Sequence, residues 1–149
     1  MKNKEIKRKR ASSSALFLTE LLVAILFFSL SASLCITIFV HAHIQSKRAK
    51  DLNNALNHCS DAAELIRTSD TIDDAFYAIK TRYPLATAGE NQDEMLVYFD
   101  EYYAPITPNA LEYKERISLK EDGGRLLARI EFEDKEGELI YSLEIIHAT

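Results

Sequence analysis

The apolar residues of this chain follow three different patterns in turn. The first is an almost purely apolar stretch, Leu16–Val40, in which Glu20 is the one strongly acidic side chain. As a helix its 25 residues span about 37 Å, which is enough to cross the roughly 30 Å hydrocarbon core of a bilayer. We therefore expect residues 16–40 to form a transmembrane helix.

The second pattern is a stripe of apolar residues at three- and four-residue steps, which predicts that the same helix continues over residues 41–69. No Gly or Pro interrupts residues 16–69, so we expect one helix of about 50 residues, roughly 75–80 Å long. Its second half is amphipathic and suits packing against a globular head. The stripe consists of Leu52, Ala55, Leu56, Cys59, Ala62, Ala63 and Ile66.

A short helix is predicted after this stalk. Thr71 is a suitable N-cap with Asp74 three residues later, as in a capping box. Apolar residues at helical spacing follow, and Pro84 is expected to end the helix.

The third pattern has a period of two and predicts strands from residue 95 onward. The expected strands are Met95–Tyr103, Tyr113–Lys120, a strand centred on residues 126–133 and a last one over residues 139–145, with a hairpin turn at Glu121–Gly124. The predicted fold class is α+β: a long N-terminal helix packed on a small antiparallel sheet of about four strands. The expected organisation is a basic leader (1–15), a transmembrane helix (16–40), an amphipathic continuation (41–69) and an extracytoplasmic α+β head (70–149).

Charge is distributed as unevenly as hydrophobicity. Residues 1–15 carry a net charge of +5, and residues 16–149 sum to −10. The basic end is expected to stay in the cytoplasm, which places the C-terminal domain outside a single-pass membrane protein. An acidic head repels phosphates, so no nucleic-acid partner is predicted for the isolated domain.

Three interpretations of the N-terminal segment compete. A secretory signal cleaved after Ser33 would leave residues 34–40 as an exposed apolar tail. A plain signal anchor would keep the whole segment. The third interpretation is a leader removed before the apolar stretch, with Glu20 as the fifth residue of the mature chain.

Around Ala15-Leu16-Phe17-Leu18-Thr19-Glu20 the sequence resembles the prepilin cleavage motif of type IV pilins and type II secretion pseudopilins. The resemblance covers roughly residues 7–45. It implies cleavage between Ala15 and Leu16 and N-methylation of Leu16. Two features depart from the family pattern: Ala15 stands where Gly is usual, and the first proline of the chain is Pro84.

The resemblance implies a structural role, as a minor pilin or pseudopilin-like subunit of a type IV pilus, type II secretion or competence-type filament. The α-amine of Leu16 would neutralise Glu20 of a neighbouring subunit and so set the register between helices that otherwise slide. The implied partners are the prepilin peptidase, other pilin or pseudopilin subunits, the membrane assembly platform and its ATPase, and membrane lipid. Packing within the membrane would involve Leu21, Leu22, Ile25 and Phe28.

The alternative function is an unprocessed single-pass anchor that carries a small extracytoplasmic binding domain. No phosphate loop, zinc-type cysteine pair or nucleophile elbow occurs, so we expect no enzymatic activity, no catalytic residue and no cofactor or metal. Cys35 and Cys59 lie too far apart on one helix to pair, and Cys59 is interpreted as a free thiol on a packed face. Asp134, Glu136 and Glu138 are interpreted as a solvated turn and not as a Ca²⁺ site.

Overall fold

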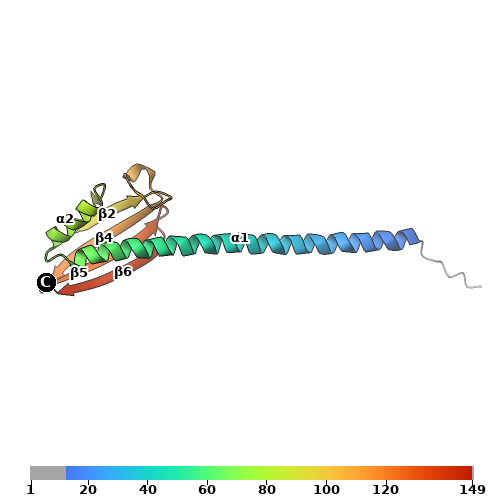
Figure 1. Ribbon diagram of the computed structural model, residues 1–149, viewed down its shortest axis with the longest axis horizontal. Coiled ribbons are helices and arrows are strands. Elements are labelled where there is room, and N and C mark those ends of the chain that lie inside the picture. The colour runs from blue at the N-terminus through green and yellow to red at the C-terminus, as the bar shows by residue number, and fades with distance from the viewer. Residues whose placement is uncertain (1–12, 149) are drawn as a thin grey trace, which may run out of the picture. The chain divides into compact units, whose positions relative to one another are not determined.

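The computed structural model describes residues 13–148 (Figure 1). They fall into two compact units that divide between Ser46 and Lys47. The helices are α1 (Ser13–Arg67), α2 (Ile72–Arg82) and the 3-10 turn η1 (Pro108–Ala110). The strands are β1 (Thr87–Ala88), β2 (Glu94–Phe99), β3 (Pro105–Ile106), β4 (Tyr113–Asp122), β5 (Arg125–Asp134) and β6 (Leu139–Ala148).

Helix α1 runs without a break through the apolar stretch and the amphipathic stripe, as predicted. In residues 13–46 four hydroxyl side chains form hydrogen bonds within the helix. Thr19, Ser29, Ser31 and Thr37 each donate their hydroxyl to the carbonyl four residues earlier, at 2.8–3.0 Å. These four hydroxyls are compatible with an apolar environment because each donates its hydrogen to a carbonyl of the same helix.

Helix α2 begins and ends as its sequence predicts. The Thr71 hydroxyl accepts the backbone N–H of Asp74 and donates to the carboxylate of the same residue. The helix ends at Arg82, with Tyr83 as C-cap directly before Pro84, whose ring disfavours a helical conformation in the preceding residue. Ala75 and Ile79 form its buried face.

The antiparallel sheet has the order β1-β2-β4-β5-β6, with β3 paired to the end of β2. The four long strands form the expected meander, which confirms the α+β fold class. The sequence did not predict β1 and β3, because two-residue strands carry no periodic signal and form only where β2 is available to pair with them. The β4–β5 hairpin turns at Gly123 and Gly124, whose φ values of 59° and 75° belong to the left-handed region that glycine adopts without steric cost.

The first long strand is shorter than predicted, because β2 stops at Phe99 and not at Tyr103. Asp100 causes the stop: its carboxylate accepts the backbone N–H groups of Tyr102 and Ala104 and folds the chain into a turn. Within this turn Tyr103 adopts a φ of 64°, which directs its side chain into the core, where it is buried.

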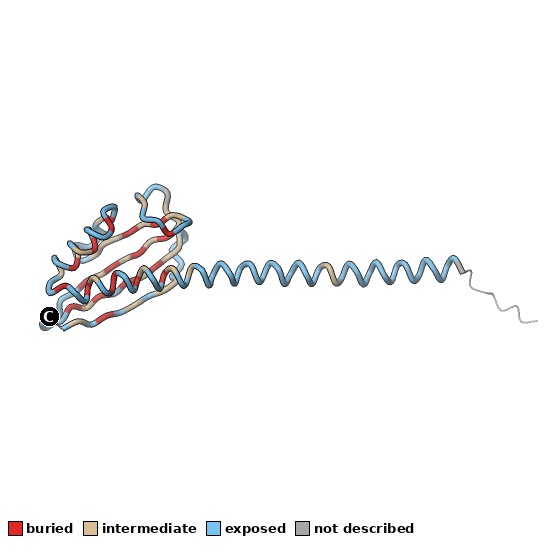
Figure 2. The backbone as a smooth tube through the Cα atoms, in the orientation of Figure 1, coloured by how far each residue is buried: buried red, intermediate tan, exposed pale blue. Residues whose placement is uncertain are grey.

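The core of residues 47–148 lies between the inner face of the sheet and the helices α1 and α2 (Figure 2). Five residues of the predicted α1 stripe are buried there: Ala55, Cys59, Ala62, Ala63 and Ile66. Leu52 and Leu56 belong to the same stripe but remain 48% and 42% exposed. They lie on the flank of the stripe, one helical turn apart, where the sheet does not cover them.

Candidate functional site

The first candidate site is the apolar segment of α1 within residues 13–46. Its large side chains are exposed, including the residues that the resemblance assigns to packing: Leu21, Leu22, Ile25 and Phe28 are 46–74% exposed. The segment reaches a mean hydropathy of 2.5, and in residues 13–148 it is the one helix long and apolar enough to cross a membrane. Length and composition equally fit a signal sequence. An apolar surface of this extent requires cover from lipid or protein.

The residues of the processing motif lie at the start of this segment. Ala15 and Leu16 are in the first turns of α1, and the carbonyl of Ala15 accepts the hydroxyl of Thr19. Glu20 lies about one turn further on, is exposed, and takes part in none of the ion pairs found among residues 13–148. The predicted roles of Leu16 and Glu20 stay predictions. Most of the basic leader, including Lys2 to Arg10, lies outside the described residues.

A cluster of polar groups joins α1 to the sheet in the second unit. The hydroxyls of Tyr103 and Tyr113 both donate to the same carboxylate oxygen of Asp51, at 2.5 and 3.0 Å. The two rings stack with their centroids 4.7 Å apart, and the Lys50 ammonium lies 5.5 Å from the centre of the Tyr103 ring. Burial, followed by the hydrogen bond to Asp51, raises the pKa of Tyr103. We call Asp51, Tyr103 and Tyr113 the helix–sheet clamp.

The most unusual residue of the core is Glu115. It lies in β4 at the centre of the sheet, in register with Val97 of β2 and Phe132 of β5, and its side chain is fully buried. Neither carboxyl oxygen has a hydrogen-bond partner among the described residues. Burial, with a contribution from the charge of Asp61, raises the pKa of this carboxyl to about 8. Glu115 is therefore mostly protonated in the folded protein at neutral pH.

Three other buried side-chain atoms also lack hydrogen-bond partners in the described structure: the Tyr83 hydroxyl, Nδ1 of His58 and Nε of Arg116. The His58 ring lies against Phe99 and Phe132, with centroids 4.3 and 5.8 Å away. Burial and the charge of Glu115 raise the pKa of the Cys59 thiol to about 12, so the thiol is protonated and poorly nucleophilic. Cys59 in this state is a poor nucleophile and fits the interpretation as a packed free thiol.

Sequence reasoning missed both the clamp and the buried acid. Glu115 carried a usable signal, because it occupies an inward position in the alternation that Tyr113, Ile117 and Leu119 define. An acidic residue at a core position of a central strand is rare and deserves a separate explanation. The clamp had no such signal, since Asp51 and Tyr103 are 52 residues apart and meet only after folding.

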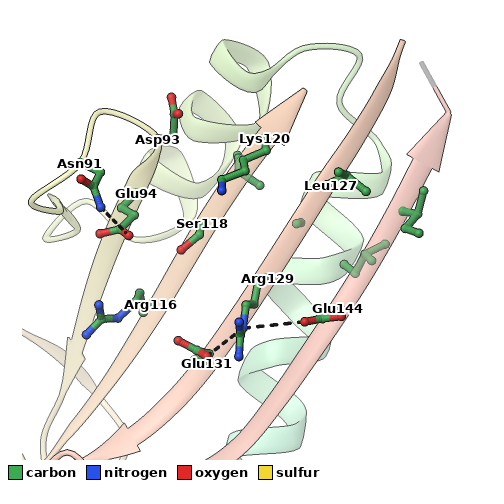
Figure 3. Close-up of a pocket in the computed structure, with 14 residues that line it drawn as sticks. Asn91, Asp93, Glu94, Arg116, Ser118, Lys120, Leu127, Arg129, Glu131 and Glu144 are labelled. Atoms are coloured by element: carbon green, nitrogen blue, oxygen red, sulfur yellow. Dashed lines mark hydrogen bonds and ion pairs between the residues drawn. The ribbon is translucent and has the colours of Figure 1, made fainter. Parts of the chain in front are cut away.

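The outer face of the sheet forms a further candidate surface, which includes a pocket across β2, β4, β5 and β6 that both charged and apolar side chains line (Figure 3). Arg129 of β5 lies 2.9 Å from Glu131 on the same strand and 3.8 Å from Glu144 on β6. Arg116 and Lys120 of β4 add positive charge beside Asp93 and Glu94. The face thus alternates in sign, which suits a specific protein contact better than a polyanion.

The described residues include no group of three or more His, Cys, Asp or Glu side chains that could hold a metal ion. Asp134, in the turn considered for Ca²⁺, uses one carboxylate oxygen to accept the backbone N–H groups of Glu136 and Glu138. Both cysteines are free, Cys59 buried as predicted and Cys35 exposed in the isolated chain.

No protein-family model matches this chain, and comparison with curated proteins and with solved structures gives no significant match. A long N-terminal helix, apolar in its first part and packed through its later part against an antiparallel sheet, is a pilin-like architecture.

Proposed function

We propose that this chain is a structural subunit, minor pilin or pseudopilin-like, of a type IV pilus, type II secretion or competence-type filament. In this proposal a prepilin peptidase cleaves between Ala15 and Leu16 and the new N-terminus is methylated. The subunit waits in the cytoplasmic membrane with its head outside. An assembly platform and its ATPase then move it into the filament, where other subunits replace lipid around the apolar helix.

The observation that carries the proposal is the exposed apolar segment of α1, which continues as one helix into a stripe that packs on the sheet. A cleavable secretory signal has no need for such continuity, because it is separated from the folded domain. A filament subunit needs it, since the same helix must leave the bilayer and enter a protein core. The side-chain hydroxyls, bonded within the helix, suit both environments.

Glu20 has a defined task in this proposal. A lone carboxylate is costly at membrane depth unless a cation neutralises it. The mature α-amine of Leu16 on a neighbouring subunit would supply that cation and hold the two helices at one axial offset. Helices joined by apolar contacts alone would have several offsets of similar energy.

The deciding experiment is intact-mass measurement with N-terminal sequencing of the protein isolated from its native host membrane. A chain that begins at Leu16 and carries an added methyl group supports the proposal. A chain that begins at Met1 replaces it with the single-pass anchor carrying a small binding domain. A chain that begins after Ser33 makes the protein a secreted one.

A further inference from the structure

A pocket of about 580 Å³ lies within the second unit, between α1 and the turn that joins β5 to β6. Most of its lining is charged. Residues of the segment 47–51 line it on the α1 side, and Glu112 and residues of the turn 134–138 line it on the sheet side. We call it the α1–turn pocket. Its volume is within the range of small-molecule sites.

Half of the charged groups in the α1–turn pocket already have partners in the folded chain. The Asp51 carboxylate accepts the two tyrosine hydroxyls of the helix–sheet clamp. The Lys135 ammonium lies 2.9 Å from a carboxylate oxygen of Glu112. The Asp134 carboxylate accepts two backbone N–H groups of its own turn. These four groups stabilise the walls of the pocket.

The other four charged groups are placed differently. On α1 they are Lys47 and Arg48, and on the turn they are Glu136 and Glu138. All four residues are exposed, and none takes part in the ion pairs found among residues 13–148. The pocket therefore offers two cations from the helix and two carboxylates from the turn. A ligand with one anionic and one cationic group complements both.

The cationic side of the pocket follows the apolar segment closely along the chain. Six residues separate Val40, the last residue of the apolar stretch, from Lys47. Both belong to the continuous helix α1, so their Cα atoms are about 10 Å apart. The headgroup layer extends roughly 5–8 Å beyond the hydrocarbon core on each side of a bilayer. Anchoring by residues 16–40 thus keeps the long side chains of Lys47 and Arg48 within reach of lipid headgroups, whatever the orientation of the head.

We propose that the α1–turn pocket binds the headgroup of a zwitterionic phospholipid with a primary ammonium group, as in phosphatidylethanolamine. The lipid phosphate accepts hydrogen bonds from Lys47 and Arg48. The lipid ammonium donates to the carboxylates of Glu136 and Glu138. Leu52 lines the same pocket and is 48% exposed, so it can contact the glycerol backbone.

The chemistry of the pocket distinguishes between phospholipids. Phosphatidylcholine has the same net charge and the same phosphate, but its methylated ammonium has no N–H to donate to the carboxylates. Phosphatidylglycerol has the phosphate and no cation, so Glu136 and Glu138 repel it. The primary ammonium is therefore the group that the turn selects. This proposal rests on the membrane anchoring in the proposed function, and not on leader cleavage or filament assembly.

The test is a lipid titration of the full-length protein in a non-ionic detergent, followed by native mass spectrometry. The probes are phosphatidylethanolamine, phosphatidylcholine and phosphatidylglycerol with identical acyl chains. The apolar segment contacts these chains equally in all three, so the ratio of the affinities reports the headgroup alone. We expect phosphatidylethanolamine to bind about tenfold more tightly than phosphatidylcholine, because only its ammonium forms charge-assisted hydrogen bonds.

Two double variants separate the two sides of the pocket. The Glu136→Ala, Glu138→Ala protein should lose the preference and bind phosphatidylethanolamine and phosphatidylcholine equally. The Lys47→Ala, Arg48→Ala protein should lose affinity for both lipids, by about tenfold, because both carry the phosphate. All four side chains are exposed, so these replacements leave the core intact.

Matched controls carry the same changes of charge outside the pocket. They are the Glu90→Ala, Glu121→Ala protein and the Lys120→Ala, Arg125→Ala protein, whose replaced residues are exposed and belong to no ion pair among residues 13–148. Both controls should keep the affinities and the preference of the wild type.

Several results would overturn the proposal. They are equal binding of phosphatidylethanolamine and phosphatidylcholine to the wild type, tighter binding of phosphatidylglycerol, a preference that survives in the Glu136→Ala, Glu138→Ala protein, and equal losses in the controls. Free phosphoethanolamine that competes at the concentrations at which the lipid binds would show that the ligand is a soluble molecule and not a lipid. A negative result leaves the filament role standing, and an unprocessed N-terminus leaves the lipid site standing, because the titration depends on neither processing nor assembly.

Discussion

The buried carboxyl of Glu115 makes the folding stability of the head depend on pH in an unusual direction. The carboxyl has a pKa of 4.5 when solvated and about 8 when folded. Between these values the unfolded chain loses the proton and the folded chain keeps it. Unfolding then releases a proton, so the free energy of unfolding falls as pH rises from about 4.5 to about 8 and levels off above that.

The size of this change in the free energy of unfolding follows from the shift in the pKa of Glu115. Each pKa unit corresponds to about 1.4 kcal/mol, so the full shift is worth about 5 kcal/mol. Small domains are commonly stable by about 5–15 kcal/mol, so a loss of this size is a large share of the total. The cause is physical: the ionised carboxylate would lie between Val97 and Phe132 with no hydrogen-bond partner among the described residues.

The assay is guanidinium unfolding of the detergent-solubilised chain from pH 5 to pH 9, followed by the tyrosine near-ultraviolet dichroism of the head. Glu115→Gln is the informative variant, because the amide has the same shape and cannot ionise. Its stability should stay nearly flat between pH 6.5 and pH 8.5, and above pH 8 it should exceed that of the wild type by a few kcal/mol.

Other groups titrate as well, so the difference between the two proteins is the quantity to measure. His58 is the main one: burial lowers its pKa in the folded state, and its contribution to stability is lost as pH falls below 6.5. That loss is common to wild type and variant and runs in the opposite direction. Equal pH slopes for the two proteins between pH 5 and pH 8 would refute the reasoning.

Three further predictions concern the clamp, the cap and the membrane segment. Tyr103→Phe removes a hydrogen bond to the Asp51 carboxylate and should lower the free energy of unfolding by about 1.5–3 kcal/mol in the same assay; an unchanged value would show that the clamp does not hold the helix. Thr71→Ala removes the N-cap of α2 and should cost about 1 kcal/mol, with Thr71→Ser as a control close to wild type. Glu20→Ala should reduce incorporation into filaments, measured by quantifying the subunit in sheared filament fractions, while the amount in the membrane stays unchanged. Normal incorporation would count against the charge pairing with Leu16, though not against pilin identity.

The sequence alone was sufficient to predict those elements that a local pattern of residues determines. The absence of Gly and Pro from residues 16–69 predicted the unbroken α1, because nothing in that range interrupts the helical hydrogen bonds. Thr71 and Pro84 predicted the ends of α2, and the two glycines at 123–124 predicted the hairpin, since each acts on its own backbone. The composition of residues 16–40 likewise predicted an apolar helix whose surface lipid or another protein must cover.

Tertiary structure decided the features that depend on distant partners. Asp51 meets Tyr103 and Tyr113 only when α1 lies on the sheet, and β1 and β3 exist only because β2 offers them an edge. Tertiary structure also decided which residues of the apolar stripe are buried: Cys59 is covered by the sheet, whereas Leu56 remains partly exposed. A sequence pattern specifies which side of a helix is apolar, but only packing determines how much of that side the protein covers and how much remains for a partner.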